Sequence, residues 1–177
     1  MSGVAEEPAV AVSRRPHRGW WLVAVLVVVV LAAGVTALGA LRGSDDTAPA
    51  RGDLAAQPTD VAVTAARDFF TLDHRTLEDD LARVAAQATG EFAAQYARQR
   101  EELARSVREG RLVITADVPE SGVAVEHATA DEVWVLVAVD VHTEPEGTDS
   151  RYRTRVVLVP APEGAAGWRV ARLEQVG

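Results

Sequence analysis

The most constraining feature of this 177-residue chain is an apolar segment, WWLVAVLVVVVLAAGVTALGAL, at residues 20–41. The segment has 22 residues and carries no charge. A helix rises about 1.5 Å per residue, so a helix of this length reaches about 33 Å and can cross a hydrocarbon core of about 30 Å. The residues before it are polar and contain Pro, so they offer no domain that could bury an apolar helix on every side. The segment therefore predicts a membrane-spanning helix.

The charges beside the segment predict its orientation. The basic residues before it are Arg14, Arg15, His17 and Arg18, whereas Arg42 after it is followed by Asp45 and Asp46. By the positive-inside rule, residues 1–19 form a cytoplasmic tail and residues 42–177 lie outside the cytoplasm. A cleaved signal peptide has a shorter apolar core of about 7 to 15 residues. We therefore expect an uncleaved signal anchor in the cell membrane.

The composition excludes several classes of partner and fold. There is no Cys, so neither a disulfide framework nor a lipidated Cys anchor can form. Residues 42–177 contain 15 Arg against 24 Asp and Glu, a formal balance of −9. Since an acidic surface repels phosphates, nucleic acid is excluded as a partner.

After the apolar segment the chain has two parts that differ in composition. Residues 42–58 are small, polar and rich in Pro and Gly, a composition typical of a flexible linker. Residues 59–177 are patterned throughout and have the size of one small domain with a single core. The chain therefore consists of a tail, an anchor, a linker and one extracytoplasmic domain.

The first half of this domain has the periodicity of three helices. Apolar residues recur every three or four positions, and Asp60, Thr76 and Thr89 are suited to cap the three N-termini. Gly110 is expected to end the third helix as a left-handed cap. The predicted apolar stripes are Val61, Ala65, Phe69 and Leu72; Leu77, Leu81, Val84 and Ala88; and Phe92, Tyr96, Leu103 and Val107.

After Arg111 the apolar period becomes two, which is typical of strands. Strands are predicted around residues 112–116, 123–125, 133–141, 152–158 and 168–170. The connections are too short for crossover helices, so successive strands should run antiparallel. Helices followed by an antiparallel meander predict an α+β domain with about three helices on one face of a sheet of four to five strands.

The alternation of apolar residues predicts which residues pair in the hairpin formed by the strands at 133–141 and 152–158. The apolar residues are odd-numbered in 133–141 and even-numbered in 152–158, so paired residues should sum to an odd number. A loop at 143–150 makes that sum 293 and places Asp140 opposite Arg153 and His142 opposite Arg151.

Three arginines at alternate positions then share one face of the second strand: Arg151, Arg153 and Arg155. They fit either an anion-binding stripe, for lipid headgroups or a partner, or a solvated face balanced by Asp140 and Glu132. The second interpretation is favoured because surface ion pairs of this kind are common.

Motifs for catalysis and cofactors are scarce. The four histidines, His17, His74, His127 and His142, have no metal-ligand spacing, so no metal site is predicted. No serine stands in a G-x-S-x-G turn, and no glycine-rich loop could hold a phosphate-bearing cofactor.

An acid–base pair of Asp68 or Asp73 with His74 is conceivable within LDHRTLEDDL, residues 72–81. The alternative, which we favour, is a junction between two helices in which Asp79 and Asp80 stabilise a helix N-terminus. We therefore expect no catalytic, cofactor-binding or metal-binding residues and no enzymatic activity.

Several segments together resemble actinobacterial Mce (mammalian cell entry)-associated membrane proteins. They are the apolar span, the linker, residues 66–103, VWVLVAVDVHT, RYRTRVVLV and GWRVARLEQV, and the most specific part is Asp73 to Phe92. The resemblance implies a cone-like, nuclear-transport-factor-2-like domain with a curved sheet. It also implies a non-enzymatic accessory or assembly subunit of an Mce-type lipid-import transporter, with other transporter subunits and lipid as partners.

Two alternatives share this layout. One is an inner-membrane assembly component of a type IV secretion-like system, and the other is a membrane-tethered enzyme resembling dehydratases and isomerases of the same fold. The enzyme needs a pocket reaching polar residues such as Asp68, Asp73, Tyr96 or Tyr152. It has no substrate site if the interior is filled by Phe69, Phe70, Phe92, Tyr96 and Trp134.

Overall fold

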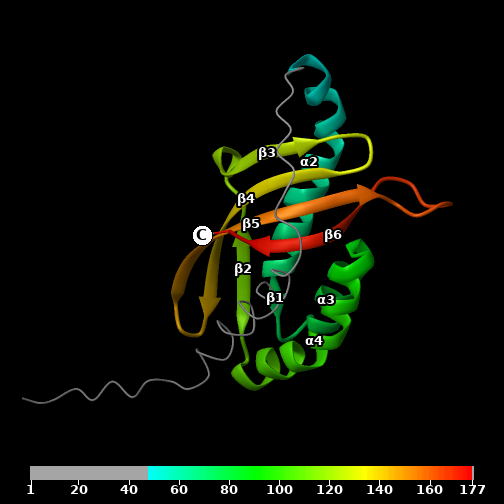
Figure 1. Ribbon diagram of the computed structural model, residues 1–177. Coiled ribbons are helices and arrows are strands. Elements are labelled where there is room, and N and C mark those ends of the chain that lie inside the picture. Colours follow the sequence, from blue (N-terminus) through cyan, green and yellow to red (C-terminus); the bar gives the residue numbers. More distant parts are fainter. Residues whose placement is uncertain (1–47, 177) are drawn as a thin grey trace, which may run out of the picture.

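Three helices come before most of the sheet in the computed structural model, which describes residues 48–176 (Figure 1). In chain order the elements are α2 (Ala48–Phe70), β1 (Leu72–Asp73), α3 (Leu77–Gln87), α4 (Gly90–Gly110), β2 (Val113–Asp117), the short 3-10 turn η1 (Glu120–Gly122), β3 (Val123–Ala128), β4 (Val133–Glu144), β5 (Thr148–Pro160) and β6 (Trp168–Gln175). The switch from helix to strand falls where the apolar period changes from three or four residues to two.

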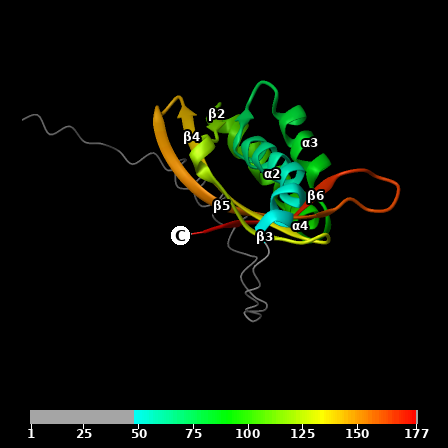
Figure 2. The same ribbon diagram turned by 90° about the horizontal axis from the view of Figure 1, so that it is seen from above.

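All strands join one antiparallel sheet in the order β1-β2-β4-β5-β6. Both β2 and β3 pair with β4: β2 takes the half near Glu144, and β3 takes the half near Val133. The sheet curves around the helices, and α2 crosses it in contact with β2 to β6 (Figure 2). The predicted α+β class, with helices on one face of a curved sheet, is confirmed.

The core lies between this sheet and the helices. Successive side chains of a strand point to opposite faces, so one parity of each long strand faces the helices. In β4 the odd residues from Val133 to Val141 are buried, and in β5 Thr154, Val156 and Leu158 are fully buried. They join the helical side chains in a single cluster. The predicted stripe of α4 is confirmed, since Phe92, Tyr96, Leu103 and Val107 are all buried.

Helix α2 begins at Ala48, earlier than the predicted cap at Asp60. The later part of residues 42–58, predicted as linker, is therefore helical. Ala55 and Pro58 are buried, so packing stabilises these turns although the local composition is typical of a linker. At its other end α2 stops at Phe70, and Leu72 extends the buried stripe from β1 instead.

The numbers of paired residues in β4 and β5 sum to an odd total, as predicted, but the register is shifted by two residues from the predicted one. Asp140 lies opposite Arg151, and His142 lies opposite Asp149. The hairpin closes between Glu144 and Thr148, a tighter turn than the predicted loop. Gly147 has a φ of +64°, a conformation that glycine adopts without steric cost and that allows the short connection.

The end of α4 also differs from the prediction. Arg111 at φ 50°, rather than Gly110, is the left-handed residue. The N–H of Leu112 donates to the carbonyl of Val107, and that of Arg111 donates to Arg108, which together form a Schellman motif. A Cβ on Gly110 would lie 2.9 Å from the Leu112 side chain. Gly110 thus makes room for Leu112 to fold back against the helix.

Within residues 48–176, none of the helices combines the length and apolar character needed to cross a membrane. The predicted cytoplasmic tail, residues 1–19, and the predicted membrane span, residues 20–41, lie outside the described residues.

Candidate functional site

The segment LDHRTLEDDL forms the junction between α2, β1 and α3. Arg75 folds back on Asp73: its backbone N–H donates to Asp73 Oδ1 at 2.8 Å, and its guanidinium Nε lies 2.9 Å and 3.0 Å from the two carboxylate oxygens. These hydrogen bonds hold the pKa of Asp73 at about 2, below its ordinary value of 3.8. Asp73 is therefore ionised and hydrogen-bonded to Arg75. A carboxylate with so low a pKa is a weak general base.

Asp80 is the organising residue of this junction. It is only 3% exposed. Its carboxylate accepts the backbone N–H of Asp73 at 2.8 Å, the hydroxyl of Thr76 at 3.2 Å and a guanidinium N–H of Arg83 at 2.5 Å. Thr76 stands at the predicted N-cap position, but its side chain binds Asp80 and caps no backbone N–H. The buried carboxylate of Asp80 therefore stabilises the junction through these hydrogen bonds.

Of the other residues considered for catalysis, His74 lies next to Asp73, whereas Asp68 has a different partner. His74 places Nδ1 3.3 Å from the carbonyl oxygen of Leu112 and 3.5 Å from Asp73 Oδ1. Asp68 accepts from the amide of Gln87 at 2.5 Å. Among residues 48–176, no contact joins Asp68 to His74, and no three His, Asp or Glu side chains are grouped so that they could hold a metal ion.

Aromatic side chains fill the space between the helices and the sheet. Phe69 lies at the centre, with ring centroids 5.2 Å from Phe70, 6.0 Å from Phe92 and 6.5 Å from Tyr96. Phe70 stacks on Tyr152 at 5.2 Å. Four of the five expected interior residues therefore occupy the cone where an enzyme of this fold would need a substrate pocket.

Trp134, the fifth, lies on the opposite face of the sheet. Its even position in β4 turns it away from the helices, and its ring lies 5.1 Å from that of His127 and 5.7 Å from the guanidinium carbon of Arg155. The parity that placed Val133 and Val135 inside already predicts this, so naming Trp134 as an interior residue was wrong.

The outer face of the sheet carries paired charges. Arg151 binds Asp140 through two N–H groups at 2.5 Å and 2.7 Å, which lowers the pKa of Asp140. Arg155 binds Glu126 at 2.5 Å and approaches Glu174 at 3.6 Å. Two of the three predicted stripe arginines are thus neutralised by carboxylates.

The partner predicted as a balance for the stripe, Glu132, pairs instead with Arg172 at 3.3 Å. A shallow hollow of about 680 Å³ lies between β2, β4 and β5, and the Asp140–Arg151 pair lines it. It is lined by both signs of charge, including Asp117, Asp140, His142, Asp149 and Arg151.

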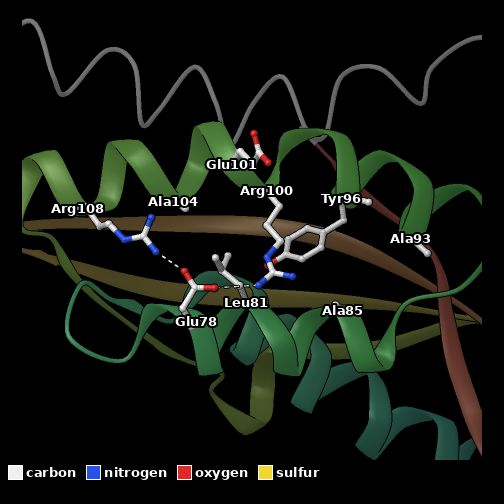
Figure 3. Close-up of a pocket in the computed structure, with 10 residues that line it drawn as sticks. Glu78, Leu81, Ala85, Ala93, Tyr96, Arg100, Glu101, Ala104 and Arg108 are labelled. Atoms are coloured by element: carbon white, nitrogen blue, oxygen red, sulfur yellow. Dashed lines mark hydrogen bonds and ion pairs between the residues drawn. The ribbon is translucent and has the colours of Figure 1, made fainter.

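A groove between α3 and α4 is a further hollow surface, and an unpartnered polar residue lines it (Figure 3). Its volume is about 490 Å³. Glu78 of α3 bridges it, binding Arg100 at 3.0 Å with one oxygen and Arg108 with the other. Tyr96 lines the groove, is 3% exposed, and its hydroxyl has no hydrogen-bond partner among the described residues.

The sequence analysis missed this groove. Tyr96 was considered as a core residue and as a possible pocket residue of an enzyme, and Glu78 was given no role. A signal was present, because small and polar residues recur on one face of α4 at positions 93, 97, 100, 104 and 108. That such a face meets α3 rather than solvent could be seen only in the packed structure.

No family model matches the chain, and no curated protein matches it. Solved structures do resemble it. The periplasmic domain of DotI matches with a TM-score of 0.58 at 15% identity, covering 76% of this chain and 99% of that one. An IcmL-like type IV secretion system protein from Legionella pneumophila matches with a TM-score of 0.54 at 18% identity, covering 76% and 94%. The VirB8 protein of Agrobacterium tumefaciens matches with a TM-score of 0.51 at 9% identity, covering 76% and 96%.

These similarities correct the functional expectation drawn from the sequence. Of the solved structures named above, one is described as a type IV secretion system protein, one as a periplasmic domain of DotI and one as a VirB8 protein, and none as part of a lipid importer. The assignment to an Mce-type lipid-import transporter is therefore wrong, and the secretion alternative fits better. What the comparisons establish is the fold: residues 48–176 share the architecture of the DotI periplasmic domain and of the IcmL-like protein.

Proposed function

We propose that this protein is a non-enzymatic assembly subunit of a type IV secretion-like machine in the cell envelope. The observation that supports this most directly is the fold. The domain matches the periplasmic domain of DotI over 99% of that chain, and it matches an IcmL-like type IV secretion protein over 94%. A match over nearly the whole of each neighbour means that the complete architecture is shared, rather than one motif.

In this proposal residues 20–41 anchor the chain in the cell membrane and residues 1–19 remain in the cytoplasm. The domain then lies outside the cytoplasm and contacts other subunits of the envelope complex. Its exposed groove and the charged outer face of its sheet offer surfaces for protein contact, and no cofactor is required for such a role.

The filled interior supports a binding role over catalysis. Phe69, Phe92 and Tyr96 occupy the space between helices and sheet, and Asp73 and Asp80 are engaged in the junction that they fasten. An enzyme of this fold would need polar groups converging on an open pocket.

The test is removal and replacement of the gene in the organism that encodes it. We expect its loss to abolish substrate transfer by the secretion machine, and the intact tagged chain to co-purify with other channel subunits after cross-linking. Unimpaired transfer, or co-purification with a lipid-importing permease instead, would contradict the proposal.

A double variant tests the non-enzymatic part. His74→Ala with Asp73→Asn should leave complex assembly and transfer near normal, because in this proposal the two side chains only shape the junction and take part in no reaction. Loss of transfer with an unchanged circular dichroism spectrum and unfolding temperature would indicate catalysis at His74 and Asp73.

A further inference from the structure

The groove between α3 and α4 is long and narrow. Its α4 wall runs from Ala93 to Arg108, which is about four helical turns or about 22 Å. The α3 wall contributes Glu78, Leu81 and Ala85. An elongated groove along two neighbouring helices has a shape that can bind a third helix.

Four of the ten residues that line the groove are alanines. They are Ala85 on α3 and Ala93, Ala97 and Ala104 on α4. Helices pack with their axes about 8 to 10 Å apart, and small residues at the contact allow the shorter distances. The walls are therefore suited to the apolar side of an amphipathic helix, whose larger side chains would lie over the alanines.

The charged residues that line the groove are two arginines and two glutamates. Arg100 and Arg108 share one carboxylate, that of Glu78. Glu101, the other acid at the rim, points away from α3 in Figure 3. Each guanidinium has several N–H donors, and only Nη2 of each arginine is used by Glu78. Donors therefore remain for a second carboxylate.

Tyr96 adds a further donor. Its hydroxyl is buried without a partner, an arrangement that costs free energy and is rare in folded proteins. Arg100 follows Tyr96 about one turn later on α4 and lines the same groove. The Arg100 side chain is 39% exposed, so it can change rotamer on the usual picosecond-to-nanosecond timescale of exposed side chains.

We propose that this groove binds an amphipathic helix of a partner subunit, and that an Asp or Glu on the apolar stripe of that helix accepts hydrogen bonds from Tyr96 and Arg100. Binding draws Arg100 from Glu78 to the incoming carboxylate and leaves Glu78 with Arg108. The identity of the partner as an envelope subunit rests on the proposed function above, whereas the chemistry of the groove does not.

The experiment uses the full chain in the producing cell. A photoreactive benzoylphenylalanine replaces Ala97 in the groove or, as a control, the exposed Ala124 of β3. We expect position 97, but not position 124, to yield a covalent adduct on a helical peptide that carries Asp or Glu between apolar residues. Mass spectrometry of the digested adduct identifies that peptide.

Point variants then test the chemistry. Arg100→Gln should lower the adduct yield roughly tenfold, and Tyr96→Phe should lower it several-fold, in keeping with the usual contribution of a hydrogen bond to a charged acceptor. Glu78→Gln should raise the yield, because it removes the carboxylate that competes for Arg100. Tyr152→Phe, which lies outside the groove, is the matched control and should change nothing.

Folding is tested separately. Because the Tyr96 hydroxyl has no partner in the domain, Tyr96→Phe should leave the unfolding temperature unchanged or slightly raised. The proposal is overturned if position 97 gives no adduct, if the adduct lies on a second copy of this chain or on a lipid, or if Glu78→Gln lowers the yield. Co-purification of wild-type protein with channel subunits is independent of these variants, so a failed groove and a failed proposed function can be told apart.

Discussion

At the scale of single residues, buried and exposed carboxylates of the junction have different roles. Asp79 and Asp80 are adjacent in sequence and both lie in the first turns of α3. Asp79 is exposed, whereas Asp80 is buried and accepts hydrogen bonds from three separate residues. Only the second can hold β1 and α3 together.

Asp80→Ala should destabilise the protein by about 2 to 3 kcal/mol, since it leaves the backbone N–H of Asp73 and the Thr76 hydroxyl without their acceptor. Asp79→Ala is the control and should change the free energy of unfolding by no more than about 0.5 kcal/mol. Urea unfolding followed by circular dichroism measures both. Equal effects of the two variants would show that Asp80 does not organise the junction.

The lowered pKa of Asp73 predicts a pH dependence. Its carboxyl has a pKa of about 2 in the folded protein against an ordinary value of 3.8, so folding favours its ionised form. This contribution is complete above pH 3.8 and is lost as the pH falls through the folded pKa. Asp73→Asn should therefore be less stable than wild type at pH 5, with the difference disappearing as the pH approaches 2. A difference that stays constant over this range in urea titrations would argue against the Arg75 interaction as its cause.

At the scale of elements, the end of α4 shows how a local motif overrides the simplest expectation. Glycine is the common left-handed residue after a helix, but here that position is occupied by Arg111 and glycine precedes it. The contact between Leu112 and the glycine backbone explains the shift, because a Cβ at position 110 would collide with that side chain.

Two substitutions at this end should act in opposite directions. Arg111→Gly should stabilise the protein by up to about 1 kcal/mol, because glycine adopts a positive φ without steric cost. Gly110→Ala should destabilise it, although alanine is the better helix former. Thermal unfolding measures both, and a stabilising Gly110→Ala would contradict the packing described for Leu112.

At the scale of the whole molecule, one cluster joins the helices to the sheet. Helix α2 crosses β2 to β6, and Phe69 near its end touches aromatic residues of α2 and α4. Helices and sheet therefore share a core and should unfold together.

Phe69→Ala should cost about 3 to 5 kcal/mol, the usual effect of removing a buried aromatic ring. Val125→Ser on the exposed strand β3 should stay within about 0.5 kcal/mol. In wild type and both variants, the urea midpoints from circular dichroism and tryptophan fluorescence should coincide. Separate midpoints would show that helices and sheet are not one cooperative unit.

Much of the fold follows from the sequence through periodicity alone. The stripe of Phe92, Tyr96, Leu103 and Val107 and the alternation along β4 were read correctly because each element has its own geometric period. The odd parity of the β4–β5 hairpin follows from the same alternation, since pairing of the opposite parity would expose one set of valines.

Tertiary structure decided the features that depend on contacts between distant segments. The start of α2 at Ala48, the two-residue shift that pairs Asp140 with Arg151, and the burial of Asp80 are of this kind. The candidate groove is another, because its polar groups come from two helices. Local patterns specify which face of an element is apolar, whereas the neighbour that covers this face depends on the packing of the whole chain, and the groove exists only where that packing leaves part of α3 and α4 uncovered.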